Sequence, residues 1–283
     1  MQGEGSPVRG MARTHWDDVL RHWRNIGPPL APSPEDIAAY ERCAARACRG
    51  RPGLDALLLG VTPQIAASRW PPATRLTAVD HSPAMIDAMW PAAGTPVGAC
   101  AIRADWRAMP IDPETIDFAV GDGCNPVLAF PNDVDAVCVE IARVLRPGGL
   151  LAFRVFLRPD VAETVEDVAH ALAAGRIGTV HALRWRLVAA MCPVTERGVR
   201  LGDVWDAWDG MRGLVARFGQ SPGWTADEIA TIDMYRNMET RFYFPTLAEM
   251  RGALSRHLAE TDRIVGGYEL AERCPILVFA KPL

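Results

Sequence analysis

The stretch from Leu54 to Asp80 limits the possible folds of the chain most strongly. It begins with the apolar run 54–59, turns sharply at Gly60, continues as a short helix and returns through 76–79 to a carboxylate. A strand that is apolar along its length suits a parallel sheet covered on both faces, with the helix as the crossover. The stretch therefore predicts a strand, helix and strand unit of an α/β fold.

Gly60 and Asp80 lie twenty positions apart, close to the spacing at which nucleotide-binding folds place an acid on a ribose hydroxyl. A carboxylate accepts hydrogen bonds from both ribose hydroxyls. In the structural alternative, Asp80 only caps the next helix, while Thr62 and Pro63 are the N-cap and first residue of the preceding one. Pyrophosphate binding needs several glycines, so the single glycine of 60–64 argues against a dinucleotide.

The alternation of strands and helices continues beyond this unit. Three more strands are expected, over 99–105, 116–120 and 150–157. A helix is expected over 133–145, closed by the Arg-Pro-Gly-Gly run 146–149. Two final strands, 263–270 and 275–280, are joined by a link too short for a crossover and should pair antiparallel.

This pattern predicts an α/β fold: a doubly wound, seven-stranded, mostly parallel sheet with an antiparallel C-terminal hairpin and a helical lid insertion. Ligands bind such sheets outside the carboxyl ends of the strands. Three acids are expected at those ends: Asp80, Asp105 and Asp122. Three acids at one sheet edge are hard to explain by helix capping alone.

Four parts of the chain are expected. They are an N-terminal helical cap (1–50), a Rossmann-like cofactor-binding core (51–158), a helical lid or substrate insertion (159–261) and C-terminal strands that complete the core sheet (262–283). In the cap, 1–10 is expected to be a disordered leader, and helices are expected over 15–24 and from Ser33 as N-cap to Arg49. The cap helices either lie across the ligand or only pack their aromatic residues on the sheet edge.

The insertion is expected to consist of helices over 161–174, 177–191, 201–218, 226–235 and 247–258. It holds most of the later aromatic residues of the chain. Placed at the ligand edge of the sheet, it is expected to act as a lid.

Composition excludes several classes of function. The formal net charge of −4, without basic clusters, disfavours nucleic-acid binding. Seven scattered cysteines without a Cys-x-x-Cys pair indicate reduced thiols in a cytoplasmic protein and argue against a metal site or a disulfide framework. No apolar run approaches the roughly 20 residues of a membrane span. The expected partner is a small molecule, and the expected state is a monomer or homodimer.

Over residues 54–157 and the terminal hairpin, the chain resembles the class I S-adenosylmethionine-dependent methyltransferases, with a divergent first glycine motif. The resemblance rests on the Gly60 turn, Val79-Asp80-His81-Ser82 with Met85, Ala104-Asp105-Trp106-Arg107 with Pro110, Gly121-Asp122-Gly123 and Val144-Leu145-Arg146-Pro147-Gly148-Gly149. Each motif is weak alone, but together, in this order and spacing, they are specific. The implied cofactor is S-adenosylmethionine, with S-adenosylhomocysteine as product.

By this resemblance Asp80 holds the ribose hydroxyls, Met85 packs near the adenine, and Asp105 binds the adenine amino group. Trp106 borders the ring, and Asp122 lies at the mouth between cofactor and substrate. The full set of expected cofactor-binding residues is Gly60, Thr62, Pro63, Asp80, His81, Met85, Ala104, Asp105, Trp106, Gly121 and Asp122.

Methyl transfer is an in-line displacement, so the protein must align the two reactants, exclude water and remove a proton from a neutral acceptor. The expected catalytic residues are Asp122 and His181, although Asp122 also suits a role in hydrogen bonding and His181 one at a helix surface. Residues expected at the substrate are Arg154, Trp185, Arg186, Tyr235 and Tyr243. Core packing or surface ion pairs are the structural alternatives for these. Asn125 and Pro126 are interpreted as a turn.

The sequence therefore predicts a metal-independent methyltransferase that acts on a small molecule, with oxygen favoured over nitrogen as the acceptor atom. Two alternatives remain. One is a non-catalytic methyltransferase-like protein that binds a ligand or partner. The other is an enzyme that binds the same cofactor but carries out different chemistry.

Overall fold

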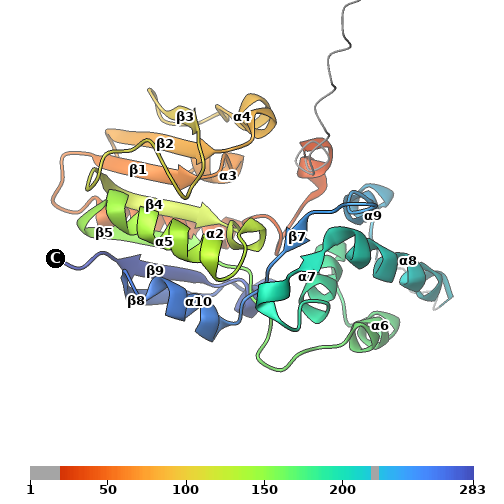
Figure 1. The fold of residues 1–283 in the computed structure, drawn as a ribbon. Helices are drawn as coiled ribbons and strands as arrows, with labels where there is room; N and C mark the ends of the chain where they lie inside the picture. Colours follow the sequence, from red (N-terminus) through yellow and green to blue (C-terminus); the bar gives the residue numbers. More distant parts are fainter. Residues whose placement is uncertain (1–19, 218–222) are drawn as a thin grey trace, which may run out of the picture.

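A seven-stranded sheet is the central element of the structure, a computed structural model that describes residues 20–217 and 223–283 (Figure 1). Its strand order is β3-β2-β1-β4-β5-β9-β8. The strands are β1 (Leu54–Leu59), β2 (Thr74–Asp80), β3 (Cys100–Arg103), β4 (Ile116–Asp122), β5 (Leu145–Arg154), β8 (Ala259–Ile264) and β9 (Ile276–Ala280). The first five pair in parallel, and β9 pairs antiparallel with both β5 and β8. The predicted fold class is confirmed.

Helices cover both faces of the sheet, because successive side chains of each buried strand point to opposite faces. In β1, Leu54, Ala56 and Leu58 pack with one cluster, and Leu57 and Leu59 pack with another. The first face is covered by α2 (Pro34–Ala47), α3 (Pro63–Ala66) and α4 (Pro83–Met89). The second is covered by α5 (Asn132–Val144) and α10 (Leu247–Leu254).

Strand register places the carboxyl ends of β1, β2 and β4 side by side. Leu59, at the end of β1, pairs with Val79 of β2 and with Gly121 of β4. The residues that follow these three positions therefore meet at one edge of the sheet, and two of them are Asp80 and Asp122.

A separate group of helices lies beyond this edge (Figure 1). It contains α6 (Val165–Ala173), α7 (Val180–Ala190), α8 (Leu201–Arg217) and α9 (Ala226–Asp233), with β6 (Val199–Arg200) and β7 (Arg241–Phe242) as a two-stranded antiparallel sheet. The sequence did not predict this pair, because two-residue strands carry no alternating pattern. The expected helix over 247–258 ends at Leu254 and packs on α5 of the core.

The N-terminal segment, residues 20–33, lies between the sheet and this helical group. Ser33 caps α2 in a reciprocal capping box with Asp36, as its sequence predicts. Residues 20–22 are helical and lead into the short helix η1 (Trp23–Asn25). The expected leader over 1–10 and the first part of the helix expected over 15–24 lie outside the described residues, as does the end of the helix expected over 201–218.

Several expected boundaries are wrong, and two of them have a cause in tertiary contacts. The run 146–149 belongs to β5 and does not form a loop, because Leu145 already pairs with Ile116, and Gly148 and Gly149 bond to the backbone of Lys281. The first strand of the terminal hairpin ends at Ile264 rather than at residue 270.

The chain beyond Ile264 turns toward α2, where Gly267 N donates to Glu35 at 2.6 Å. The link between β8 and β9 therefore spans residues 265–275 and contains η4 (Ala271–Arg273). The pairing is antiparallel as expected, but the link is longer than the sequence suggested.

Asn125 fixes the chain segments that follow β4 and β5. It begins the short helix η2 (Asn125–Val127) and is almost fully buried. Its Nδ2 donates to the carbonyl of Phe156 at 2.8 Å, and its Oδ1 accepts from the amide of Phe156, also at 2.8 Å. The turn interpretation of this residue is therefore incomplete, because its amide acts as a clamp on the chain beyond β5.

We expect Asn125→Ala to lower the free energy of unfolding by about 2–4 kcal/mol, because it leaves two buried backbone groups unpaired at about 1–3 kcal/mol each. Urea unfolding followed by circular dichroism measures this change. Asn132→Ala, at an exposed position in α5, is the matched control, with an expected change within about 0.5 kcal/mol. Equal effects of the two substitutions would contradict the clamp.

Candidate functional site

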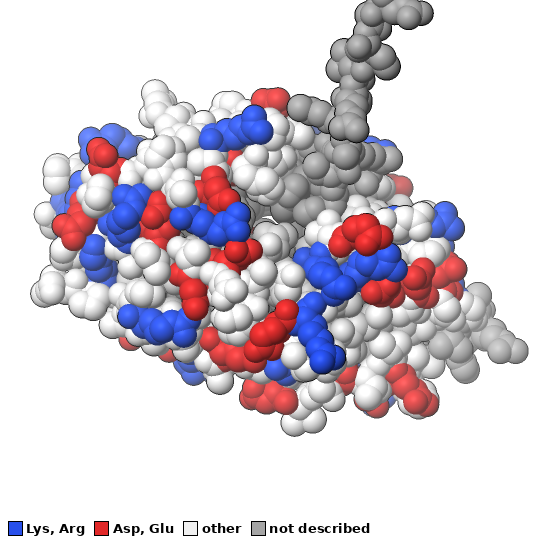
Figure 2. Space-filling model, in the orientation of Figure 1, with Lys and Arg blue, Asp and Glu red and all other residues white. Residues whose placement is uncertain are grey.

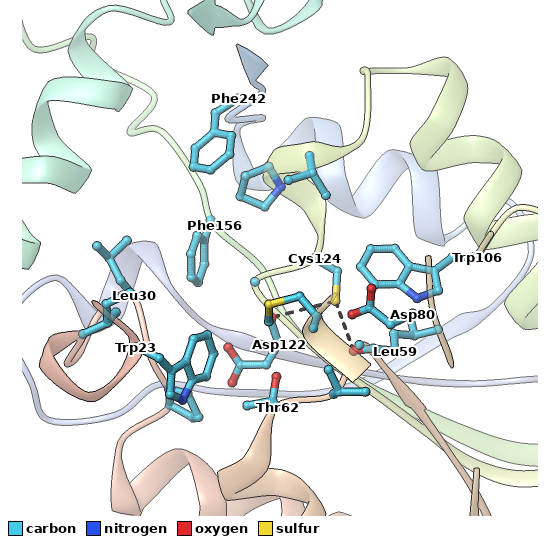
Figure 3. Close-up of a pocket in the computed structure, with 18 of the residues that line it drawn as sticks. Trp23, Leu30, Leu59, Thr62, Asp80, Trp106, Asp122, Cys124, Phe156 and Phe242 are labelled. Atoms are coloured by element: carbon cyan, nitrogen blue, oxygen red, sulfur yellow. Dashed lines mark hydrogen bonds between the residues drawn. The ribbon is translucent and has the colours of Figure 1, made fainter. Parts of the chain in front are cut away.

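A pocket opens at the shared carboxyl edge of β1, β2 and β4 (Figure 3). Three parts of the chain form its walls. The sheet edge contributes Leu59, Gly60, Val61, Thr62, Asp80, Met85, Trp106, Asp122, Gly123, Cys124, Pro126 and Val127. The N-terminal segment contributes Trp23, Ile26, Leu30 and Pro32. The chain beyond β5 contributes Phe156, Arg184, Tyr235 and Phe242. Most of these side chains are apolar, so the few polar groups define what the pocket can bind.

The turn after β1 gives the pocket its floor beside Asp80. Gly60 has a φ of +88°, a left-handed conformation that favours glycine. A Cβ atom there would lie 3.8 Å from Oδ2 of Asp80 and 3.9 Å from the Trp106 ring. The missing side chain therefore keeps open the space between the carboxylate and the indole.

Asp80 is held at this edge by its own turn. Its Oδ1 accepts from the amide of Ser82 at 2.8 Å, and Ser82 caps α4 through the amide of Met85. Burial raises the pKa of Asp80, against the lowering effect of the Ser82 amide. Asp80 thus lines the pocket and also takes part in the turn before α4. A role only at the start of this helix, the structural alternative, therefore describes one of its two roles.

Met85 and Trp106 flank this carboxylate. Met85 is 5% exposed, and Trp106 is fixed by a hydrogen bond from Nε1 to the carbonyl of Val79 at 2.6 Å. Figure 3 shows Trp106 next to Asp80 on one side of the pocket, with Trp23 and Leu30 on the opposite side. A carboxylate beside an indole and a thioether is a suitable arrangement for a ribose that carries a flat base.

Asp122, at the end of β4, is the second carboxylate of the pocket. Its register neighbour on β5 is Arg154, whose Nη2 donates to Oδ1 at 2.6 Å. Oδ2 also accepts from the Tyr40 hydroxyl at 3.1 Å. Burial raises the pKa of Asp122 although Arg154 favours its charged form.

Arg154 is fully buried and does not line the pocket. Besides Asp122, it donates to the carbonyl of Pro29 at 2.8 Å and to the hydroxyl of Tyr268 at 3.2 Å, and it lies 3.9 Å from Asp36. The guanidinium thus joins the N-terminal segment, α2 and the link before β9 to the carboxyl edge of the sheet.

Among the described residues of the helical group, one charged side chain lines the pocket, that of Arg184 in α7. It is 3% exposed, and its Nη2 donates to the hydroxyl of Tyr235 at 2.8 Å. Its guanidinium carbon lies 4.6 Å from the centroid of the Tyr235 ring. The sequence did not identify Arg184, although an arginine within a helix that is apolar on nearly all sides was an available signal.

Several expected cofactor residues lie near the pocket without lining it. Pro63 is the first residue of α3, Ala104 donates its amide to the carbonyl of Asp80, and Gly121 packs within β4 against Phe153. The His81 side chain is 60% exposed. Asp105 is 47% exposed at its side chain and forms an ion pair with Arg107 at 2.6 Å.

The expected catalytic residue His181 also lies outside the pocket lining. It is buried in α7 and faces Gly27, where an added Cβ would lie 3.4 Å from its ring. Burial, with a contribution from Arg184, lowers the pKa of His181 to about 4. The imidazole is therefore neutral near pH 7.

Three other expected substrate residues lie outside the pocket lining. Trp185 is fully buried, and its ring centroid lies 4.3 Å from that of Phe156. Arg186 forms an ion pair with Glu163. Tyr243 donates its amide to the carbonyl of Pro126. Of the five expected substrate residues, only Tyr235 lines the pocket.

The described residues contain no group of three or more histidine, cysteine or acidic side chains placed to hold a metal ion. Within the same residues, no helix is long and apolar enough to cross a membrane. Figure 2 shows acidic and basic side chains interspersed over the face in view.

A family model described as a methyltransferase domain matches residues 58–153 of the chain. This range runs from the end of β1 to the end of β5 and contains the Gly60 turn, Asp80 and Asp122. No match was found among curated proteins.

Solved structures share the fold at low sequence identity. The N-methyltransferase NodS from Bradyrhizobium japonicum WM9, in complex with S-adenosylhomocysteine, is 13% identical with a TM-score of 0.51, over 95% of this chain and 99% of that one. An S-adenosylmethionine-dependent methyltransferase from Methanosarcina mazei is 13% identical with a TM-score of 0.51, over 90% of this chain and 100% of that one. A Rhodobacter sphaeroides protein described as a zinc-dependent alcohol dehydrogenase is 12% identical with a TM-score of 0.53, over 93% and 98%.

At these identities the structural likeness shows the fold alone. The family match is independent of it and covers the part of the chain that forms the carboxyl edge of the sheet. Residues 58–153 are thus similar to a methyltransferase domain, and the chain has a fold that solved S-adenosylmethionine-dependent methyltransferases share.

Proposed function

We propose that the protein is an S-adenosylmethionine-dependent methyltransferase that acts on an oxygen atom of a small molecule. The observation that carries the proposal is the space between Asp80 and Trp106 that Gly60 keeps open at the carboxyl edge of the sheet. It offers a buried carboxylate for two ribose hydroxyls and flat or soft apolar side chains for a base, as S-adenosylmethionine requires.

The residues present fit this cofactor without a phosphate site. Only one glycine stands in the turn after β1, and α3 has four residues, so a pyrophosphate cradle is missing from this edge. S-adenosylmethionine has no phosphate. When bound, it supplies an activated methyl group on a sulfonium.

The rest of the pocket suits a small acceptor that is largely apolar. Trp23 and Leu30 of the N-terminal segment line it together with Phe156 and Phe242 (Figure 3). These side chains exclude water and align the acceptor, which together account for much of the catalysis in a displacement reaction. Aromatic faces also favour a nearby cation such as a sulfonium.

Asp122 is proposed to accept the proton of the acceptor hydroxyl. It lines the pocket, and its raised pKa makes it a better proton acceptor than a surface carboxylate. Arg154 and Tyr40 hold both oxygens in place. A neutral hydroxyl loses its proton when it is methylated, so a proton acceptor in the pocket favours oxygen as the methylated atom.

Cofactor binding can be tested without knowledge of the acceptor. We expect Asp80→Asn to weaken the binding of S-adenosylhomocysteine roughly ten- to hundredfold, because hydrogen bonds to a charged group contribute about 1.5–3 kcal/mol. Calorimetric titration of both proteins measures this. Asp87→Asn, at an exposed position in α4, is the matched control and should bind as the wild type does. Failure of the folded wild type to bind would overturn the proposed function and favour the non-catalytic alternative.

The same titration should depend on pH in a defined direction. The ribose hydroxyls donate to the ionised carboxylate, and burial raises the pKa of Asp80. The affinity for S-adenosylhomocysteine should therefore be highest near neutral pH and fall on acidification. The midpoint of this fall should lie above the pKa of about 3.9 that is typical of aspartate. Asp80→Asn should remove this dependence. A pH profile identical in wild type and variant would rule out Asp80 as the titrating group.

Methyl transfer itself is tested by incubating the protein with methyl-labelled cofactor and a library of small hydroxylated compounds, with mass spectrometry to identify the product. We expect Asp122→Asn to lower kcat by about 10²- to 10⁴-fold, the usual contribution of a general base. Tyr40→Phe, which removes only the hydrogen bond to Oδ2, should have a smaller effect.

Three outcomes would contradict this assignment. Full activity of Asp122→Asn would remove its catalytic role, and a loss seen only with His181→Gln would transfer the role to the histidine. Cofactor that binds and is consumed without methylated product would favour the alternative of other chemistry on the same cofactor.

A further inference from the structure

Arg184 is a buried cation that lacks a carboxylate partner. The residue is only 3% exposed, yet its Nε and Nη1 atoms have no hydrogen-bond partner. Within residues 20–217 and 223–283, no carboxylate forms an ion pair with it. The other deeply buried arginine, Arg154, shows the usual arrangement, since it is paired with Asp122 at 2.6 Å.

Such an arrangement is costly in a folded protein. A charge taken out of water needs an opposite charge and hydrogen bonds, and buried polar atoms in native structures almost always have partners. The stacking of Arg184 on Tyr235 offsets part of this cost. It leaves the N–H groups of Nε and Nη1 without an acceptor.

The unpaired atoms belong to a side chain that lines the pocket, so a ligand can supply what the protein does not. Tyr235 adds a further donor at the same place. Because its oxygen accepts the hydrogen bond from Arg184 Nη2, its own O–H remains to donate into the pocket. Arginine has donors and no acceptor, so the two residues form a cluster that offers only hydrogen-bond donors.

The other charges of the pocket do not neutralise this cluster. Asp122 is already paired with Arg154. Asp80 lies at the sheet edge beside Trp106 (Figure 3), where the proposed cofactor requires it. The wall formed by the helical group is therefore left with a net positive charge next to the apolar faces of Phe156 and Phe242.

We propose that the methyl acceptor is an organic acid whose carboxylate is bound by Arg184 and Tyr235, with a flat apolar body between Phe156 and Phe242. The unpaired Nε–H and Nη1–H lie on different edges of the planar guanidinium fork, so the acid accepts a charge-assisted hydrogen bond from one of them and a second from the Tyr235 hydroxyl. The identification of the bound acid as the methyl acceptor rests on the proposed function, whereas the carboxylate site itself does not depend on the reaction. The cofactor also carries a carboxylate, on its methionine end, so the test must separate the two sources.

The first arm measures the acceptor site directly. The protein is saturated with S-adenosylhomocysteine and titrated with two matched pairs of probes, benzoate against benzamide and indole-3-acetate against indole-3-acetamide. We expect each carboxylate to bind roughly ten- to hundredfold more tightly than its neutral amide, the range of a charge-assisted hydrogen-bonded pair. Arg184→Gln should abolish this preference and Arg184→Lys should restore part of it, because lysine keeps the charge without the fork.

The second arm identifies the source of the carboxylate. S-adenosylhomocysteine and 5′-methylthioadenosine, which lacks the amino-acid end, are titrated into wild type and Arg184→Gln. Equal affinities of wild type and variant for both compounds are expected. A loss confined to S-adenosylhomocysteine would assign Arg184 to the cofactor and overturn the proposal. If the wild type binds neither compound, the proposed function fails, and the carboxylate preference is then measured in the protein without cofactor.

Stability measurements separate a binding role from a structural one. Arg184→Met replaces the unpaired charge by an apolar chain of similar length, so it should raise the thermal midpoint of the ligand-free protein. Benzoate should raise the midpoint of the wild type but not of this variant. Arg200→Gln is the matched control, because Arg200 pairs with Asp203 and Glu239 outside the pocket, and it should keep the carboxylate preference. A wild type without that preference, or a lowered midpoint for Arg184→Met, would overturn the proposal.

Discussion

The ion pair between Arg154 and Asp122 is the interaction on which the arrangement of the site depends. β4 and β5 are neighbours in the sheet, and their register sets the two side chains opposite each other. Burial makes the pair expensive unless its remaining hydrogen bonds are satisfied. Pro29, Tyr40 and Tyr268 satisfy them, so the cost of desolvation is met only when segments distant in the sequence come together.

The site is consequently coupled to the N-terminal segment. Pro29 lies next to Leu30 in the chain, and Leu30 forms part of the pocket wall. The contact of Pro29 with Arg154 therefore places an apolar wall opposite Asp80 and Trp106. A buried charge at the sheet edge thus determines where an uncharged part of the pocket lies, although Arg154 itself does not line the pocket.

The sequence predicts the sheet well because each strand and helix has a recognisable pattern within its own residues. Apolar strands separated by short helices leave few alternatives to a parallel sheet, and the carboxyl edge follows from topology. Asp80 was accordingly expected at this edge, and the resemblance to methyltransferases added Met85 and Trp106. All three line the pocket. The boundaries at 146–149 and 264 were wrong because tertiary pairing with Lys281 and Glu35 decides them.

The helical group was far less predictable. α7 is buried on nearly all sides, so its sequence has no apolar stripe that would show which residues face the ligand. Arg184 and Arg186 are two positions apart and chemically identical. Only the tertiary structure shows that Arg186 meets Glu163, while Arg184 meets the pocket. Trp23 and Phe156 likewise reach the site through long-range packing that no local pattern records.

The position of β9 has a consequence for the synthesis of the chain. β9 lies between β5 and β8, although it (Ile276–Ala280) is the last of the seven strands of this sheet in sequence order. Until these residues leave the ribosome, β5 is an exposed edge of a largely complete parallel sheet. Unpaired strand edges readily join to other chains. The growing polypeptide thus carries an aggregation-prone edge from the synthesis of β5 until β9 joins it, and removal of residues 276–280 would leave that edge open.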